Sequence, residues 1–223
     1  MASTKARVET GPFLAPTMVA ALKRALGVLA GLAIIAVSVA AVTALFTYHP
    51  DDPSWNTSTD MAVRNGLLEP GALFSDAMLQ SLGLAAAIPI LVVAAWGGRV
   101  MRGETVSWLW LRTVSVPMAA LLLAIGLAGI TQPTGWALPS GLGGFSGQLL
   151  SDVAVLKLSA IGDPESVRWL LTALCCFAGL VLFHWVWTVP LTTYVVIAGR
   201  CRTEALHTIT WMLSIFGRIR NEL

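Results

Sequence analysis

Charged residues are scarce in this sequence. Asp, Glu, Lys and Arg make up 12% of its 223 residues, whereas soluble domains carry about 25%. Hydrophobic residues make up 56%, and the mean hydropathy is +0.76. A chain with so little polar surface is not a soluble globule. It is a polytopic helical membrane protein, because long apolar segments in lipid must satisfy their backbone hydrogen bonds internally.

Other absences exclude several function classes. The three cysteines predict no disulfide framework, because Cys175 and Cys176 are adjacent in an apolar run and Cys201 lies in a basic segment. The sequence has no G-x-x-x-x-G-K-[ST], H-E-x-x-H, C-x-x-C or Ser-His-Asp pattern. It also has only three lysines, so no basic nucleic-acid surface is expected. We therefore expect no catalytic residue, metal or cofactor, and no nucleic-acid contact.

Long apolar runs predict an all-α bundle with four transmembrane helices, at about 25–48, 75–96, 114–130 and 169–197. At ~1.5 Å per residue such runs cross roughly 30 Å of hydrocarbon. Pro89 predicts a bend in the second helix and Pro190 an interruption of the fourth. Gly27 and Gly31 form a G-x-x-x-G pattern, which either allows close helix approach or arises by chance.

The flanking segments are polar. Residues 1–24 are expected to form a cytoplasmic tail, and 198–223 a cytoplasmic segment that leads to a linker or lies as an interfacial helix. Eleven of the 14 Lys and Arg residues lie in 1–24, 97–112 and 198–223. Because basic residues accumulate on the cytoplasmic side, both termini are predicted to be cytoplasmic and the other two loops to face outward.

The third connection, 131–168, is the longest and has structure of its own. After two turn signals, Leu149, Val153, Leu156 and Ala160 recur at helical spacing. This spacing predicts an amphipathic helix that lies on the membrane surface or on the other helices. The glycines before it are not a phosphate-binding fingerprint, since no strand precedes them and no lysine follows.

The segment 46–56, FTYHPDDPSWN, interrupts the apolar pattern abruptly. Pro50 ends the preceding helix, and Asp52-Pro53-Ser54 favours a turn. Tyr48 and Trp55 are rings suited to a membrane interface. An ordinary interhelical turn would explain this shape. It does not require two carboxylates, two prolines and a tryptophan together, which also suit a partner contact.

Two further polar groups have alternative interpretations. His49 with Asp51 and Asp52 could bind a cation, although adjacent carboxylates diverge in an extended segment and a second histidine is missing nearby. His184, near the middle of the fourth predicted span, is an intramembrane ionisable residue and therefore a candidate haem ligand or proton relay. A neutral imidazole that hydrogen-bonds a neighbouring helix is the simpler interpretation. Asp76 and Asp152 are interpreted as helix-end and surface charges.

The sequence resembles the N-terminal membrane domain of the FtsK/SpoIIIE family of bacterial DNA translocases. The resemblance extends over about 22–200, and the DPSW-like core of the first loop is its most specific part. The matching residues are Tyr48, Pro50, Asp51, Asp52, Pro53, Ser54 and Trp55, then Asn65, Gly66, Pro70, Gly71 and Ala72, and the G-G-x-x-G element Gly143, Gly144 and Gly147.

The resemblance implies a four-helix anchor in the bacterial inner membrane that localises to the division septum, oligomerises and contacts other division proteins. In the family this anchor precedes a linker, an ATP- and Mg²⁺-dependent hexameric DNA motor and a DNA-reading domain. This sequence stops at Leu223, so no residue here is assigned to ATP hydrolysis or DNA binding. The alternatives are a stand-alone accessory subunit of a larger membrane complex and a haem- or proton-handling protein built on His184.

Overall fold

The computed structural model describes residues 15–136, 138, 140–160 and 162–189. The chain divides into two units, Met1–Trp187 and Thr188–Leu223, and the described helices all belong to the first. All regular structure in the described residues is helical, and four helical segments are long and apolar enough to cross a membrane. The predicted all-α membrane bundle is thereby confirmed.

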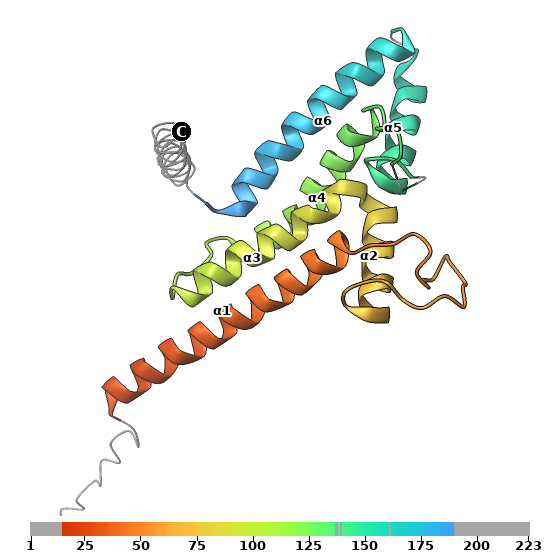
Figure 1. The fold of residues 1–223 in the computed structure, drawn as a ribbon. Coiled ribbons are helices and arrows are strands. Elements are labelled where there is room, and N and C mark those ends of the chain that lie inside the picture. Colours follow the sequence, from red (N-terminus) through yellow and green to blue (C-terminus); the bar gives the residue numbers. More distant parts are fainter. Residues whose placement is uncertain (1–14, 137, 139, 161, 190–223) are drawn as a thin grey trace, which may run out of the picture. The chain divides into compact units, whose positions relative to one another are not determined.

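Helices α1 (Pro16–Phe46) and α3 (Ala87–Met101) lie side by side (Figure 1). Glycines at the contact let the two backbones approach. A Cβ on Gly31 would lie 2.6 Å from the carbonyl oxygen of Gly97, and one on Gly97 would lie 2.8 Å from Cγ2 of Ile34. Small residues favour such contacts in membrane bundles. The G-x-x-x-G pattern therefore serves a contact within the chain, because Gly31 is covered by α3.

The second apolar run turns a corner between α2 (Leu68–Leu82) and α3 (Figure 1). Gly83 has a φ of +60°, a conformation that glycine adopts without a side-chain clash. It opens the short 3₁₀ helix η1 (Gly83–Ala86). The bend that was predicted at Pro89 lies instead at Gly83. Pro89 is in the first turn of α3, where a missing N–H is tolerated.

Helices α4 (Leu109–Ala128) and α6 (Pro164–Trp187) form the second close pair. Leu123 and Ala124 of α4 join Ala85 in one buried cluster, and Val92, Val116 and Val186 form another between α3, α4 and α6. Side chains of the neighbouring helices also donate hydrogen bonds to carbonyl groups in the last turn of α6. The indole N–H of Trp96 donates to the carbonyl of Val186 at 3.1 Å, and Arg112 donates to that of Trp185 at 2.8 Å.

The helix in the third connection is present as α5 (Gly144–Leu158). Its buried face consists of Gly144, Gly147, Ser151 and Val155, so small residues pack against the bundle. Leu149, Val153 and Leu156, the predicted apolar stripe, are exposed. Of the two predicted placements, this stripe does not lie on the other helices. It remains available to the membrane.

The predicted span limits differ from the helix ends. The first helix begins at Pro16 and ends at Phe46, and the second span contains the corner at Gly83. The fourth helix runs from Pro164 to Trp187, and the predicted continuation through Pro190 to 197 lies outside the described residues. Helix ends do not mark the membrane boundary, so the span limits stay predictions.

Candidate functional site

The first loop, residues 47–67, joins α1 to α2 and is folded around a buried carboxylate. Asp52 is 5% exposed. Its two oxygens accept hydrogen bonds from the backbone N–H groups of Arg64 at 2.8 Å and Asn65 at 2.9 Å. Hydrogen bonds to an ionised acceptor are stronger than neutral ones. Asp52 therefore joins the start of the loop to its end, and this limits the conformations of the residues between Asp52 and Arg64.

Asn65 ties the closed loop to both flanking helices. Its side-chain amide donates to the carbonyl of Ala44 at 2.9 Å and to Oγ of Ser75 at 3.3 Å. Its Oδ1 accepts from the N–H of Leu67 at 3.0 Å. The last carbonyls of a helix lack intrahelical donors, so Asn65 satisfies one from α1. An amide suits this position because it both donates and accepts.

A second polar chain links the end of α1 to α2. The Tyr48 hydroxyl donates to Oδ1 of Asp76 at 3.3 Å, and Nε2 of Gln80 donates to the same oxygen at 2.7 Å. Asn56 in turn donates to Oε1 of Gln80 at 3.0 Å. Burial, and then the Asp76 carboxylate, raise the pKa of Tyr48 to about 12. Asp76 is 4% exposed and lies in the interior of α2, so its interpretation as a helix-end charge was wrong.

The hydrogen-bonded residues Tyr48, Asp52, Asn65, Ser75, Asp76 and Gln80 form the frame of the first loop. This frame supports a short exposed segment. Oγ of Ser54 accepts the N–H groups of Asn56 and Thr57 at 3.3 and 3.1 Å, which makes a tight turn. Trp55 lies in that turn and is 81% exposed. Pro50 and Asp51 are also exposed, and Pro53 is half-buried. The predicted loop residues therefore fall into two groups: those that hold the fold of the loop, and those that are exposed on its surface.

His49 belongs to the edge of this frame. Its Nε2 lies 2.7 Å from a guanidinium nitrogen of Arg64, and its Nδ1 lies 3.7 Å from Asp51. Asp52 points instead to backbone N–H groups. Among the described residues no group of three or more His, Cys, Asp or Glu side chains could hold a metal ion. The geometry gives the cation interpretation no support.

The predicted glycines of the third connection do not join the first loop. Gly143 and Gly147 lie against the carbonyl of Ala124 on α4, where a Cβ would have no room. Gly144 lies against the backbone of Gly83 at the corner, and the N–H of Leu84 donates to the carbonyl of Leu142 at 2.9 Å. The glycines therefore seat α5 on α4 and on the corner.

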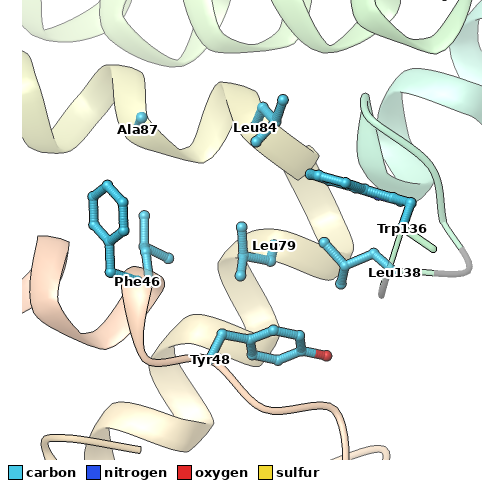
Figure 2. A pocket seen from close by; sticks show the side chains of 8 residues that line it. Phe46, Tyr48, Leu79, Leu84, Ala87, Trp136 and Leu138 are labelled. Carbon is cyan, nitrogen blue, oxygen red and sulfur yellow. The ribbon is translucent and has the colours of Figure 1, made fainter. Parts of the chain in front are cut away.

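An apolar pocket of about 430 Å³ lies where these parts meet. Figure 2 shows Phe46 from the end of α1, Leu79 from α2, Leu84 from η1, and Trp136 and Leu138 from the third connection around it. Tyr48 contributes its ring to the wall. The pocket is lined almost entirely by apolar groups, so it offers packing surface without polar chemistry.

His184 lies in the last turn of α6. Its predicted place near the middle of the fourth span depends in part on residues 190–197, which lie outside the described residues. His184 is half-buried and interacts with at least one other group. The cofactor interpretation gains nothing from this position.

Sequence reasoning missed Ser75 and Asp76 as parts of the frame. Both are polar residues on an otherwise apolar helix, and both are buried. Their spacing from Gly71 and Ala72, which are also buried, was the signal: these four residues share the face of α2 that packs on the loop and α1.

Comparison with known proteins agrees with this architecture. A family model described as the 4TM region of DNA translocase FtsK/SpoIIIE matches residues 23–195. The chain belongs to this family. The resemblance noted in the sequence is thereby confirmed, and the four apolar helices together with family membership support a location in the inner membrane.

Curated relatives in this family are far longer than the matched region. The chain is 36% identical to DNA translocase FtsK of Brucella suis over 129 residues, which is 58% of this chain and 15% of that protein. It is 34% identical to that of Azospirillum brasilense over 162 residues, which is 71% of this chain and 26% of that protein. The Caulobacter vibrioides protein is 33% identical over 143 residues. No solved structure matches the chain.

Proposed function

We propose that this chain is the membrane anchor of a DNA translocase that acts in cell division and chromosome segregation, and that its first loop contacts other membrane or division proteins. The family match over 23–195 carries the proposal. The relatives are named DNA translocases, and the matched region is a minor part of their length. In such a protein ATP and Mg²⁺ would serve a motor that follows the anchor.

The design of the first loop supports a contact role. Asp52 and Asn65 are almost fully buried and hold the backbone, whereas Trp55 is 81% exposed. Large aromatic side chains on a rigid support often carry much of the energy of a protein contact, because little conformational entropy is lost on binding. The exposed residues Pro50, Asp51 and Trp55 are the proposed contact.

Substitution of Trp55 by Ala tests this contact. The change removes an exposed ring and no hydrogen bond of the frame, so the protein should insert normally but fail to concentrate at the division site. The measurement is the position of a fluorescent fusion in cells whose only copy is the variant, together with cell length. Met61, which is 55% exposed on the same loop, gives the matched control Met61→Ala. Normal localisation and division of Trp55→Ala would remove the contact role.

The translocase part of the proposal has a separate test. An epitope placed at the N-terminus of the chromosomal gene reports the mass of the natural polypeptide on a denaturing blot. A product several times larger than 23.6 kDa is expected, since the relatives are much longer than the region matched here. A product of 23.6 kDa would contradict the translocase and favour an accessory subunit of a larger membrane complex.

We assign both termini to the cytoplasm and expect copies of the chain to associate through their spans. The distribution of Lys and Arg supports the first assignment. The association is supported by the exposed side of α1, which carries Leu22, Leu26 and Leu29. These side chains suit contact with either lipid or another helix. Cysteine cross-linking between copies along this face would distinguish association from lipid exposure.

A further inference from the structure

A basic pocket lies at the end of the bundle opposite the first loop, between the start of α1 and the end of α3. Its walls carry three basic side chains, Lys23, Arg24 and Arg102, and one carboxylate, Glu104. Its volume is about 800 Å³. The remaining lining residues are Gly27, Val28, Val100, Met101 and Gly103.

The depth of the pocket matches the phospholipid headgroups. A hydrocarbon core of roughly 30 Å takes about 20 helical residues. The first membrane span predicted from the sequence begins at about residue 25. Lys23 and Arg24 then lie just outside the hydrocarbon, while Val28 and Met101 give the same pocket an apolar lining.

Charge in the pocket is only partly compensated. Glu104 accepts a hydrogen bond from Arg102 at 2.7 Å and lies 3.4 Å from Nε of Arg99. The hydrogen bond from Arg102 lowers the pKa of Glu104, so this carboxylate is charged at neutral pH. Lys23 and Arg24 are exposed and form no ion pair within the part of the chain that the structure describes. Two cations therefore remain available to a ligand.

The pocket is open beside Gly103. A Cβ on Gly103 would meet nothing within 4 Å, and Gly103 has a φ of +73°, which favours glycine over other residues. On α1, a Cβ on Gly27 would lie 3.5 Å from the carbonyl of Val100, which is ordinary contact with the end of α3. The space beside the basic side chains is thus not filled by the chain itself.

We propose that the basic pocket binds the headgroup of an anionic phospholipid, whose acyl chains run along Val28 and Met101 into the bilayer. Basic pockets between membrane helices are suited to acidic headgroups. The apolar wall favours a lipid over a free phosphate ion, because a free ion would leave that wall in contact with water. The proposal rests on membrane insertion and is independent of any role in division.

The test uses the purified full chain in a neutral detergent, with phosphatidylglycerol and phosphatidylcholine of identical acyl chains as probes. Native mass spectrometry counts the bound lipid at each concentration. We expect phosphatidylglycerol to bind at least tenfold more tightly than phosphatidylcholine. Lys23→Gln and Arg24→Gln should each weaken phosphatidylglycerol about fivefold, in keeping with the effect of one basic residue at a lipid surface.

Two further variants sharpen the result. Glu104→Gln removes the carboxylate that engages Arg99 and Arg102, so it should tighten phosphatidylglycerol about fivefold. Lys157→Gln removes one exposed charge from α5, outside the basic pocket, and should leave binding unchanged. Weaker phosphatidylglycerol binding by Lys23→Gln together with tighter binding by Glu104→Gln would not result from general destabilisation of the protein.

Three outcomes would overturn the proposal. Equal affinity for the two lipids would show that headgroup charge is not recognised. Equal weakening by Lys157→Gln and Lys23→Gln would show attraction to the whole surface in place of a pocket. Displacement of phosphatidylglycerol by inorganic phosphate at an equal concentration would show that the lipid as such is not the ligand.

Discussion

Asn65 is the residue on which the geometry of the first loop depends most. It joins a carbonyl of α1, a hydroxyl of α2 and the N–H of Leu67. Asn65 is 2% exposed, so water cannot replace a lost partner. Unpaired buried polar groups cost about 1–3 kcal/mol each.

Replacement of Asn65 by Asp tests this dependence. The carboxylate keeps the size of the amide but removes the donor to Ala44 and Ser75, and it buries a charge beside acceptors. We expect the free energy of unfolding to fall by at least about 1–3 kcal/mol, measured by denaturant titration in mixed micelles. Asn56→Asp, the same change at an exposed amide of the loop, should stay within about 0.5 kcal/mol. Equal effects of the two changes would contradict the central role of Asn65.

Tyr48 makes the stability of this region depend on pH at the alkaline end. Its pKa rises from 10.0 to about 12 in the folded protein. The folded state thus holds the phenolic proton after the unfolded state has lost it. The contribution to stability is complete below pH 10 and is lost as the pH rises toward 12.

The expected result is an unfolding free energy that falls between pH 10 and 12, and a smaller fall in Tyr48→Phe. Because the chain has two tyrosines, absorbance titration of a Tyr194→Phe variant reports Tyr48 directly. Asp76→Asn should lower the pKa of Tyr48 without restoring it to 10, since burial is the larger cause. Asp51→Asn, at an exposed carboxylate, is the control. A Tyr48 that ionises at pH 10 in the otherwise intact protein would contradict the buried hydrogen bond to Asp76.

Among the helices, α5 shows how small residues can decide a contact. Gly143 and Gly147 abut the carbonyl of Ala124, whereas Phe145, Leu149 and Leu156 of α5 are exposed. The backbone of α5 therefore packs directly on α4. This arrangement leaves no room for additional methyl groups.

A change of Gly147 to Ala should lower the free energy of unfolding by about 1–3 kcal/mol, the usual cost of overpacking. The same measurement in mixed micelles applies. Phe145→Ala, at a 65% exposed position of the same helix, is the control and should have little effect. A neutral Gly147→Ala would mean that α5 does not pack on α4 through this face.

Hydropathy predicted the helices because it depends on composition averaged over many residues. It did not predict the corner at Gly83, since neither the positive φ nor the close backbone of Leu142 and Gly144 changes the average hydropathy. The packed face of α5 was missed for a related reason: a glycine face carries no hydrophobic signal. The burial of Asp76 was missed because Tyr48, its partner from the first loop, meets it only after this loop packs on α2. Gln80 contacts Asp76 within α2 itself.

For the molecule as a whole, the two ends of the bundle differ in chemistry. The first loop, the corner and the start of α5 lie at one end, linked by hydrogen bonds such as that from Leu84 to Leu142. The basic pocket and the side chains that donate to the last turn of α6 lie at the other. Each end therefore contains residues from distant parts of the sequence, so the difference in chemistry between the two ends arises only when the bundle is assembled.

This difference predicts the orientation. The end that holds Lys23, Arg24, Arg99 and Arg102 should face the cytoplasm, because basic residues near helix ends are retained on that side. Alkaline phosphatase, which is active only outside the cytoplasm, should therefore be active when inserted in the first loop and inactive when inserted after Glu104. The opposite activities would contradict the orientation but would leave the helix pairs intact. Activity at both insertions would instead contradict the antiparallel pairing of α1 and α3, because Gly31 and Gly97 bring their spans together only when the first loop and Glu104 lie on opposite sides of the membrane.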